Sequence, residues 1–273
     1  MLGAQLCIKS FTLFDKIGME ILVGEPKILS QGLNRAVFEI SPLFAGYGAT
    51  IGNSLRRVLL SSMEGAAVVK VKINGVPHEF TAVSGVLEDV VDIILNLKKV
   101  RFKLSGVDSA KAILSVKGEK EVKAGDLKLP TGAEVVNPEQ LICTISDKKT
   151  ELEMEIEVEK GIGYVPVEQR QKEKLSVGEI AIDAIFSPVR KVSFRIENIR
   201  VGERTDFNSL ILVIETDGSV TPQEALKKAI GILVGQFKTM GESAGLQAEE
   251  KPLIGEEAPK KKRGRPKKIS KEV

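Results

Sequence analysis

The sequence of 273 residues predicts an α+β protein, and three observations indicate this fold class. Segments with the two-residue periodicity of strands fill the middle of the chain, from about residue 100 to residue 160. Segments with helical periodicity precede and follow this part of the chain. A hydrophobic fraction of 42% is sufficient for a sizeable core. A chain of this length forms one large domain or two smaller ones.

Composition excludes several classes of protein. Aromatic residues make up only 4% of the chain and tryptophan is absent, which is a poor composition for a surface that stacks on bases or sugars. No apolar run approaches the roughly 20 residues of a membrane span, and the amino-terminus lacks the features of a secretory signal. Cys7 and Cys143 form no CxxC motif. We therefore expect a cytoplasmic protein with no membrane contact and no disulfide framework.

The first helix is expected at 50–62, with Thr50 as its N-cap. At about 100° per residue, one side of this helix is suited to a core. That side consists of Ile51, Leu55, Val58, Leu59 and Ser62. Asn53, Arg57 and Leu60 fall on the opposite side, where a leucine is unusual if the face meets only solvent. The pattern predicts a second covered face, with Arg57 placed to contact another molecule.

The middle of the chain combines a second helix with several strands. A strand is expected at 66–73, followed by a turn at Asn74-Gly75. The helix is expected at 84–99, with its apolar face formed by Val86, Val90, Ile93, Ile94 and Leu97. The strand at 151–160 alternates strictly, with glutamates outward and with Leu152, Met154, Ile156 and Val158 inward. Strict alternation favours a solvated strand face over an acidic catalytic cluster.

The last helix is expected at 221–240. Thr221 is its N-cap, Pro222 occupies the first helical position and Glu224 completes a capping box. A seam of apolar residues recurs at spacings of three and four, formed by Leu226, Ile230, Leu233, Phe237 and Met240. Two interpretations are open, a helix packed on its own sheet and a helix–helix contact in a dimer. Ala229 and Val234 widen the apolar face beyond one seam and favour the dimer.

The chain after residue 240 is rich in Gly, Pro, Glu and Lys, and 241–273 is expected to be disordered. Residues 260–273 contain eight Lys or Arg and one Glu. The formal charge of +3 therefore divides into +7 for this segment and −4 for residues 1–259. Any signal for nucleic-acid binding belongs to this basic tail.

The sequence offers no convincing catalytic or metal site. His78 is the only histidine, and it follows a turn with no nucleophile motif nearby. The glycine-rich stretch GYGATIGN lacks the features of a phosphate-binding loop. The segment 204–208 has one Asp and one Asn, whereas metal-dependent nucleotidyl transfer requires several carboxylates. We expect a binding or scaffold protein without catalytic residues, metal or cofactor.

Several segments, in order along the chain, resemble the family of bacterial RNA polymerase alpha subunits. They are GATIGNSLRRVLLSSMEGAAVVKVKINGVPHEF, GVLEDVVDIILNLK, GYVPVEQR and DAIFSPVRKVSFRIENIRVGERTDFNSLILVIETDGSVTPQEAL. The resemblance runs from about residue 8 to 240. It implies a discontinuous dimerisation domain, 1–62 with 178–240, built from an antiparallel sheet and two main helices. A mainly β domain, 63–177, is inserted into it.

The resemblance also implies partners. Members of the family form a homodimer on which the beta and beta-prime subunits assemble for DNA-templated transcription. The catalytic magnesium site lies in beta-prime, so this chain is expected to be a non-catalytic subunit of a nucleotidyltransferase, associated with the nucleoid.

The resemblance and the helical patterns together predict which residues contact other subunits. The expected contacts with beta are Asn53, Arg56, Arg57 and Leu60, where the arginines occupy the family's paired positions. The expected contacts with a large subunit are Lys98, Gly163, Tyr164, Val165 and Pro166. The expected dimer contacts are Leu55, Leu59, Leu226, Ile230, Leu233 and Phe237.

The chain departs from the family pattern mildly at Ala45 and Ile51. The larger departure is at the end, because only about 33 residues follow the last expected helix. The family normally carries a helical carboxy-terminal domain there that binds promoter DNA, and this chain is expected to lack it.

The tail 260–268 is expected to contact DNA instead, through residues that resemble an AT-hook: Arg263, Gly264, Arg265, Pro266, Lys267 and Lys268. The match has a physical reason, because the minor groove of A·T tracts is narrow and strongly negative and arginine side chains can lie along its floor. The alternative for the tail is a basic segment that binds any polyanion. For the whole chain, the alternatives are an independent DNA-binding architectural protein and, more remotely, a stand-alone enzyme.

Overall fold

The computed structural model describes residues 24, 26–170, 176 and 178–244. It divides into two compact units, Met1–Gly235 and Gln236–Val273. Within the described residues the first unit is a mixed α+β structure in which all strand ladders are antiparallel. The predicted α+β class is confirmed at this level.

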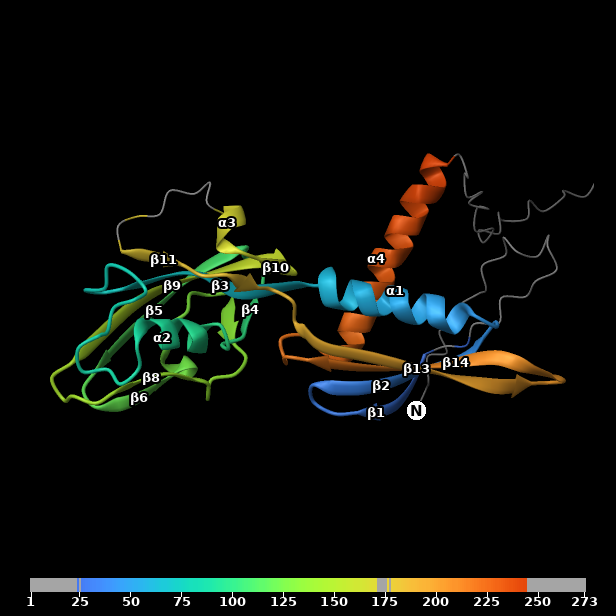
Figure 1. The fold of residues 1–273 in the computed structure, drawn as a ribbon, viewed down its shortest axis with the longest axis horizontal. Coiled ribbons are helices and arrows are strands. Elements are labelled where there is room, and N and C mark those ends of the chain that lie inside the picture. Colours follow the sequence, from blue (N-terminus) through green and yellow to red (C-terminus); the bar gives the residue numbers. More distant parts are fainter. Residues whose placement is uncertain (1–23, 25, 171–175, 177, 245–273) are drawn as a thin grey trace, which may run out of the picture. The chain divides into compact units, whose positions relative to one another are not determined.

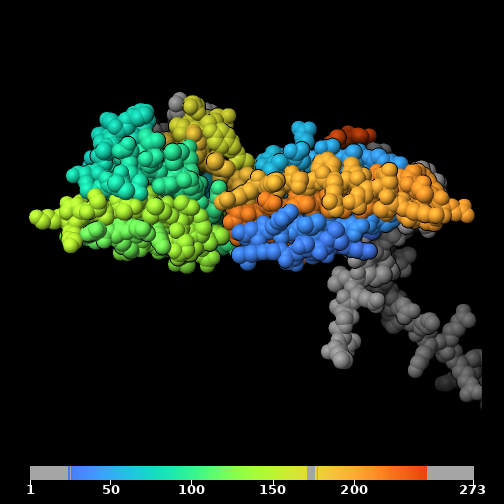
Figure 2. Space-filling view, turned by 60° about the horizontal axis from the view of Figure 1, so that its bottom comes forward, coloured from blue at the N-terminus to red at the C-terminus, as the bar shows by residue number. Residues whose placement is uncertain are grey.

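A four-stranded sheet brings together segments from both ends of the chain, in the order β1-β2-β14-β13. Its strands are β1 (Lys27–Gln31), β2 (Arg35–Leu43), β13 (Val189–Val201) and β14 (Arg204–Thr216). Strands β13 and β14 form a long hairpin, and Figure 2 shows the blue amino-terminal strands beside these orange strands. The core on this sheet is formed by Phe38, Ile40, Leu55, Leu59, Leu210, Leu212, Ile214 and Leu226, among others.

Helix α1 (Tyr47–Ser61) lies across β13 and β14 (Figure 1). It begins before Thr50, so the predicted N-cap is wrong. The N-cap is Gly46, whose positive φ of 84° suits a glycine. The Gly46 N–H donates to Asn208 Oδ1 at 2.9 Å. The helix is therefore capped by a side chain 162 residues further along the chain, which local sequence could not reveal.

Two glycines let α1 approach the sheet closely. A Cβ at Gly52 would lie 2.8 Å from Cδ2 of Phe194 and 3.0 Å from Cδ1 of Leu210. A Cβ at Gly48, one turn earlier, would lie 3.1 Å from Cγ2 of Ile196. Gly48 and Gly52 are both buried. At these two positions of the helix a larger residue would therefore collide with side chains of the sheet.

A six-stranded sheet and a second core occupy the middle of the chain. Its strands are β3 (Glu64–Ile73), β4 (Phe102–Leu104), β5 (Ser109–Lys117), β7 (Ala133–Val135), β9 (Glu151–Ile162) and β11 (Glu179–Ala181). Two short ladders pair β6 (Lys120–Lys123) with β8 (Leu141–Ile145) and β10 (Tyr164–Val165) with β12 (Ala184–Ile185). The short helices are η1 (Ala124–Asp126) and α3 (Val167–Arg170).

This second core includes Ile180 and Ile182, because β11 pairs with β3. Residues 179–182 therefore belong with the middle segment, and the expected boundary at 178 falls too early. The alternation predicted for β9 is confirmed, since its four inward residues are at most 2% exposed. The turn at Asn74-Gly75 is also confirmed, with φ of 78° at Gly75.

Helix α2 spans only Val90–Leu97, so the prediction of a helix at 84–99 is wrong in length. The preceding residues pair with β8 instead. The Leu87 N–H donates to the Thr144 carbonyl at 3.0 Å, and the Glu88 carboxylate accepts from the Thr144 N–H at 2.7 Å. A tertiary pairing therefore overrides the helical pattern. Val90, Ile93 and Leu97 do lie in the core, as expected.

Helix α4 (Pro222–Ser243) carries the predicted capping box. The Glu224 N–H donates to Thr221 Oγ1, and the Thr221 N–H donates to Glu224 Oε2, each at 3.3 Å. The helix continues past Met240, so the expected start of disorder at 241 is too early. The rest of the expected disordered segment lies outside the described residues.

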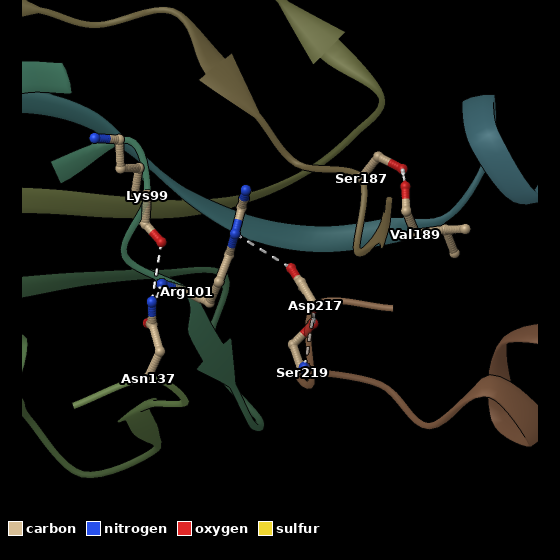
Figure 3. A network of polar contacts seen from close by, with 7 residues as sticks. All are labelled: Lys99, Arg101, Asn137, Ser187, Val189, Asp217 and Ser219. Carbon is tan, nitrogen blue, oxygen red and sulfur yellow. Dashed lines mark hydrogen bonds and ion pairs between the residues drawn. The ribbon is translucent and has the colours of Figure 1, made fainter. Parts of the chain in front are cut away.

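A buried polar network connects the loop before β4 to the end of β14 (Figure 3). Arg101 Nε lies 3.6 Å from Asp217 Oδ2, with the two side chains 15% and 4% exposed. Asp217 Oδ1 accepts from the N–H and the hydroxyl of Ser219 at 3.0 and 2.6 Å. Asn137 accepts from the Arg101 N–H at 2.7 Å and donates to the Lys99 carbonyl. Burial lowers the pKa of Arg101, and the nearby Asp217 partly offsets this.

We predict that Gly52→Ala destabilises the fold by about 1–3 kcal/mol, because the new Cβ overlaps the Phe194 ring. The control is Gly231→Ala in α4, where a Cβ meets nothing within 4 Å. Alanine there should be neutral or stabilise the protein by up to about 1 kcal/mol through helix propensity. Chemical denaturation measures both changes, and equal stability of the two variants would contradict the close packing of α1.

Candidate functional site

The outer face of α1 carries the residues expected to meet beta. Asn53, Arg56, Arg57 and Leu60 are all exposed. On the inner face Leu55 is 3% exposed and Leu59 is fully buried. The predicted division of the helix into a core face and an outer face is therefore correct, with Arg57 on the outer face.

The guanidinium groups of the two arginines on this face have no ion-pair partner in the part of the chain that the structure describes. Neither Arg56 nor Arg57 forms an ion pair with any residue that the structure describes. Ser61 Oγ donates to the backbone carbonyl of Arg57 at 2.7 Å, and this bond does not involve the Arg57 side chain. An arginine presents five N–H donors in a planar fork that matches a carboxylate. This face can therefore bind an acidic or carbonyl-rich partner surface.

A second candidate surface gathers around Asp183, between β11 and β12. Lys98, at the carboxyl end of α2, donates from Nζ to Asp183 Oδ2 at 3.2 Å. The Val167 N–H donates to Asp183 Oδ1 at 3.1 Å. Lys98 and Val167, the residue that directly follows the segment 163–166, therefore meet at one carboxylate. Figure 1 shows β10, α3 and β11 in the same region.

The segment 163–166 has only one side chain well placed for a partner. Tyr164 is 58% exposed and lies opposite Ile185, which is 43% exposed. Val165 is partly buried against a small core that includes Phe186, and the Gly163 carbonyl accepts from the Phe186 N–H at 2.8 Å. Gly163, Val165 and Pro166 are partly exposed, and the contact expected of the segment 163–166 stays a prediction.

Charge and hydrogen-bond interactions shift the pKa values of two residues of this second surface. The Val167 N–H and, after it, Lys98 hold the pKa of Asp183 below its usual value, against the effect of burial. Loss of solvation and the Asp183 carboxylate raise the pKa of the Tyr164 hydroxyl. Asp183 is therefore ionised and Tyr164 neutral at physiological pH.

The sequence analysis did not single out Asp183 or Asn208. Asp183 interrupts the apolar run 180–186, and this was the available signal for it. Asn208 is 8% exposed, accepts from Gly46 and donates to Asn198 Oδ1 at 3.1 Å. Nothing in the local sequence indicates that Asn208 caps a distant helix.

The expected dimer contacts divide into two groups. Leu55, Leu59 and Leu226 are at most 5% exposed in the single chain, so they belong to its own core and are corrected to that role. Leu233 is partly buried against the same core. A stripe at helical spacing on α4 is exposed, with Ile230 at 37%, Val234 at 60%, Phe237 at 63% and Met240 at 64%.

Other features of the described residues offer no site. His78 is exposed, its Nδ1 lies 3.1 Å from Thr81 Oγ1, and the turn role expected for it fits this position. Cys143 is buried, and its burial raises the pKa of the thiol to about 12. No group of potential metal ligands gathers among residues that the structure describes. Within the same residues no helix is long and apolar enough to cross a membrane.

The basic residues of the tail, 260–268, lie outside the described part of the chain. The DNA contact expected of Arg263, Gly264, Arg265, Pro266, Lys267 and Lys268 stays a prediction.

Comparisons with known proteins define the class to which this fold and these surfaces belong. Residues 71–187 match the family model of the RNA polymerase Rpb3/RpoA insert domain. Most of the middle sheet and its core, and the residues around Asp183, fall within this match, which begins inside β3. The middle of the chain is thus a domain that is characteristic of RNA polymerase subunits.

Relatives that match most of the chain give the particular family. The chain is 46% identical over 231 residues to the DNA-directed RNA polymerase subunit alpha of Roseiflexus castenholzii, covering 85% of this chain and 71% of that protein. It is 46% identical over 227 residues to the alpha subunit of Cytophaga hutchinsonii, covering 81% and 69%. It is 48% identical over 202 residues to that of Aquifex aeolicus, covering 74% and 63%.

The chain belongs to the family of DNA-directed RNA polymerase alpha subunits. Its core function is therefore that of this subunit in transcription.

Proposed function

We propose that the chain is an assembly platform: two copies pair, and the dimer receives the beta and beta-prime subunits. The observation that carries this proposal is the outer face of α1, where two exposed arginines without ion-pair partners among the described residues lie on a helix packed tightly against its sheet. In this proposal the larger subunits carry out the polymerase chemistry, and this chain provides the surfaces on which they assemble.

We propose two structural domains for this platform. The core under the four-stranded sheet draws on residues 36–63 and 189–229, and the core of the six-stranded sheet draws on residues 68–182. This separation supports a discontinuous dimerisation domain with an insert. The insert extends through β12, because β12 pairs with β10, and the matched residues 71–187 agree with this boundary.

Beta is proposed to bind the outer face of α1 through Arg57. Arg57 lies one turn from Asn53 and close to Leu60, so a cation, an amide and an apolar group share the exposed face. Buried arginines with apolar neighbours are typical centres of binding energy in interfaces. Arg56 lies beside Arg57 and extends the basic part of this face.

Arg57→Ala is predicted to weaken binding of beta by about 2–4 kcal/mol, the range of an interface hot spot. Its own fold should be unchanged, because the side chain has no intramolecular partner among the described residues. Titration of the purified chain with beta measures the affinity, and thermal unfolding checks the fold. Lys149→Ala removes an exposed cation in the insert and serves as the control. Equal affinities for the two variants would refute the role of Arg57.

The second copy is proposed to bind the exposed apolar stripe of α4. Leu226 and Ala229 fix the start of the helix on its own core, while Ile230 and Val234 face outward. Four large apolar side chains at helical spacing on an exposed face are typical of a helix–helix interface.

Val234→Glu is predicted to convert the dimer to monomers, because it buries an unpaired charge in the interface at a cost of several kcal/mol. Val234 is suitable because its 60% exposure leaves the fold of one chain intact, whereas Leu233 packs on that chain's core. Gln236→Glu introduces the same charge on the opposite side of α4 and serves as the control. Sedimentation velocity distinguishes the species, and a Val234→Glu protein that sediments as a dimer would exclude this seam.

A further inference from the structure

We infer that the buried ion pair of Arg101 with Asp217 holds the two larger cores of the chain in one orientation. Arg101 lies between Val100 and Phe102, which belong to the core of the six-stranded sheet. Asp217 directly follows β14, which belongs to the four-stranded sheet. The inference concerns the chain by itself, so it does not rest on the proposed binding of other subunits.

The chain crosses between the two cores at two neighbouring connections. It passes from α1 into β3 at residues 62–63 and returns from β12 to β13 at residues 186–188. Ser187 Oγ, in the second connection, donates to the Leu60 carbonyl beside the first at 3.2 Å. Connections that run side by side act as a hinge, because they leave rotation about them as a freedom of the two bodies. The orientation of the two cores therefore depends on contacts outside these connections.

The backbone on each side of the ion pair is fixed within its own core. The Arg101 N–H donates to Asn137 Oδ1 at 2.7 Å, and the Arg101 carbonyl accepts from the Val136 N–H at 2.8 Å. Asp217 Oδ1 accepts from the Ser219 N–H at 3.0 Å, which orients the carboxylate. Because both partners are already ordered, their pairing loses less conformational entropy than the pairing of two mobile side chains at the surface.

Burial makes this pair depend on the Asp217 charge. Arg101 Nε lies 3.6 Å from Asp217 Oδ2, and Figure 3 shows the arginine directed toward the carboxylate. Nε is buried and has no hydrogen-bond partner among the described residues, so the nearby carboxylate compensates its charge. Arg190 lies close enough to repel the Arg101 guanidinium. Without the carboxylate, Arg101 would be a buried cation facing a second cation, which strongly destabilises this arrangement.

Close packing accompanies the ion pair at the same place. Gly218, the residue after Asp217, has a φ of 97°, and a Cβ added there would lie 3.2 Å from Cγ1 of Val136. Val136 is also the residue whose N–H binds the Arg101 carbonyl. The two segments thus meet through a polar contact and an apolar contact, and a rotation about the connections would open both.

The alternative is that Asp217 serves only its own turn, through Ser219. Asp217→Asn separates the two roles, because asparagine keeps an oxygen for Ser219 but turns an NH₂ group, which cannot accept, toward Arg101. Arg101→Met removes the charge and keeps an apolar side chain. Arg204→Met and Asp206→Asn are the matched controls, since Arg204 and Asp206 form an exposed ion pair at 2.7 Å within β14 alone.

The measurement is the distance between spin labels on the two sheets, determined by double electron–electron resonance on the full chain. The labels are attached to cysteines that replace Ser115 in β5 and Ser193 in β13, both of which are exposed. Cys7 is replaced by serine, and Cys143 is retained because it is buried. Mixing with an excess of unlabelled chain ensures that each observed pair of labels lies within one chain.

The unmodified ion pair and both control variants should give one narrow distance. Asp217→Asn and Arg101→Met should each add a second distance, with the fraction of chains in the open arrangement raised about tenfold or more. The double variant should open no further than the more open single variant, because both substitutions remove the same contact.

One narrow distance in Asp217→Asn would assign Asp217 to its turn alone and overturn the inference. So would two distances in the chain with the intact pair, or equal opening by the control variants. Circular dichroism checks that each variant is folded. If Asp217→Asn does not fold, Arg101→Met decides by the same criterion, and one narrow distance in that variant would overturn the inference.

Discussion

The close approach of helix α1 to the hairpin of β13 and β14 is the constraint on which the rest of the arrangement depends. At Gly52 a single Cβ would overlap the Phe194 ring, so the backbone of the helix packs directly on the side chains of Phe194 and Leu210. Asn208, from the same hairpin, caps the helix through Gly46. Sheet and helix are therefore joined at two places by residues near 50 and near 208. This contact fixes the rotation of α1, and the rotation decides which residues face outward.

A fixed rotation explains why one short helix serves two purposes. Its inner face supplies Leu55 and Leu59 to the core, and its outer face presents Arg56 and Arg57 without partners among the described residues. The second candidate surface, around Asp183, is also fixed by an internal contact, but that contact is polar. There the Asp183 carboxylate accepts from Lys98 at the end of α2 and from the Val167 N–H at the start of α3. In both places an internal contact fixes the position of a short helix at the surface.

Much of the fold could be predicted from sequence where the signal was local. The alternation of β9 and the capping box of α4 depend on residues within one element, and both are correct. The length of α2 and the N-cap of α1 were wrong because distant residues decide them: Thr144 pairs with the residues before α2, and Asn208 caps α1. For the sites, the helical wheel placed Arg57 on the outer face of α1. It could not separate the residues of the chain's own core from apolar residues left at the surface, because Leu59 and Phe237 are both apolar and only the packing shows that the first is buried and the second exposed.

The central claim is that the outer face of α1 meets a large subunit because the inner face is fixed on the sheet. Photocrosslinking tests this most directly, with a benzophenone amino acid placed at position 53 on the outer face and at position 149 on the insert. The label at 53 should form an adduct with beta in the assembled polymerase, and the label at 149 should form none. An adduct of position 53 with a second copy of this chain, or with no partner in an assembled and active polymerase, would contradict the account.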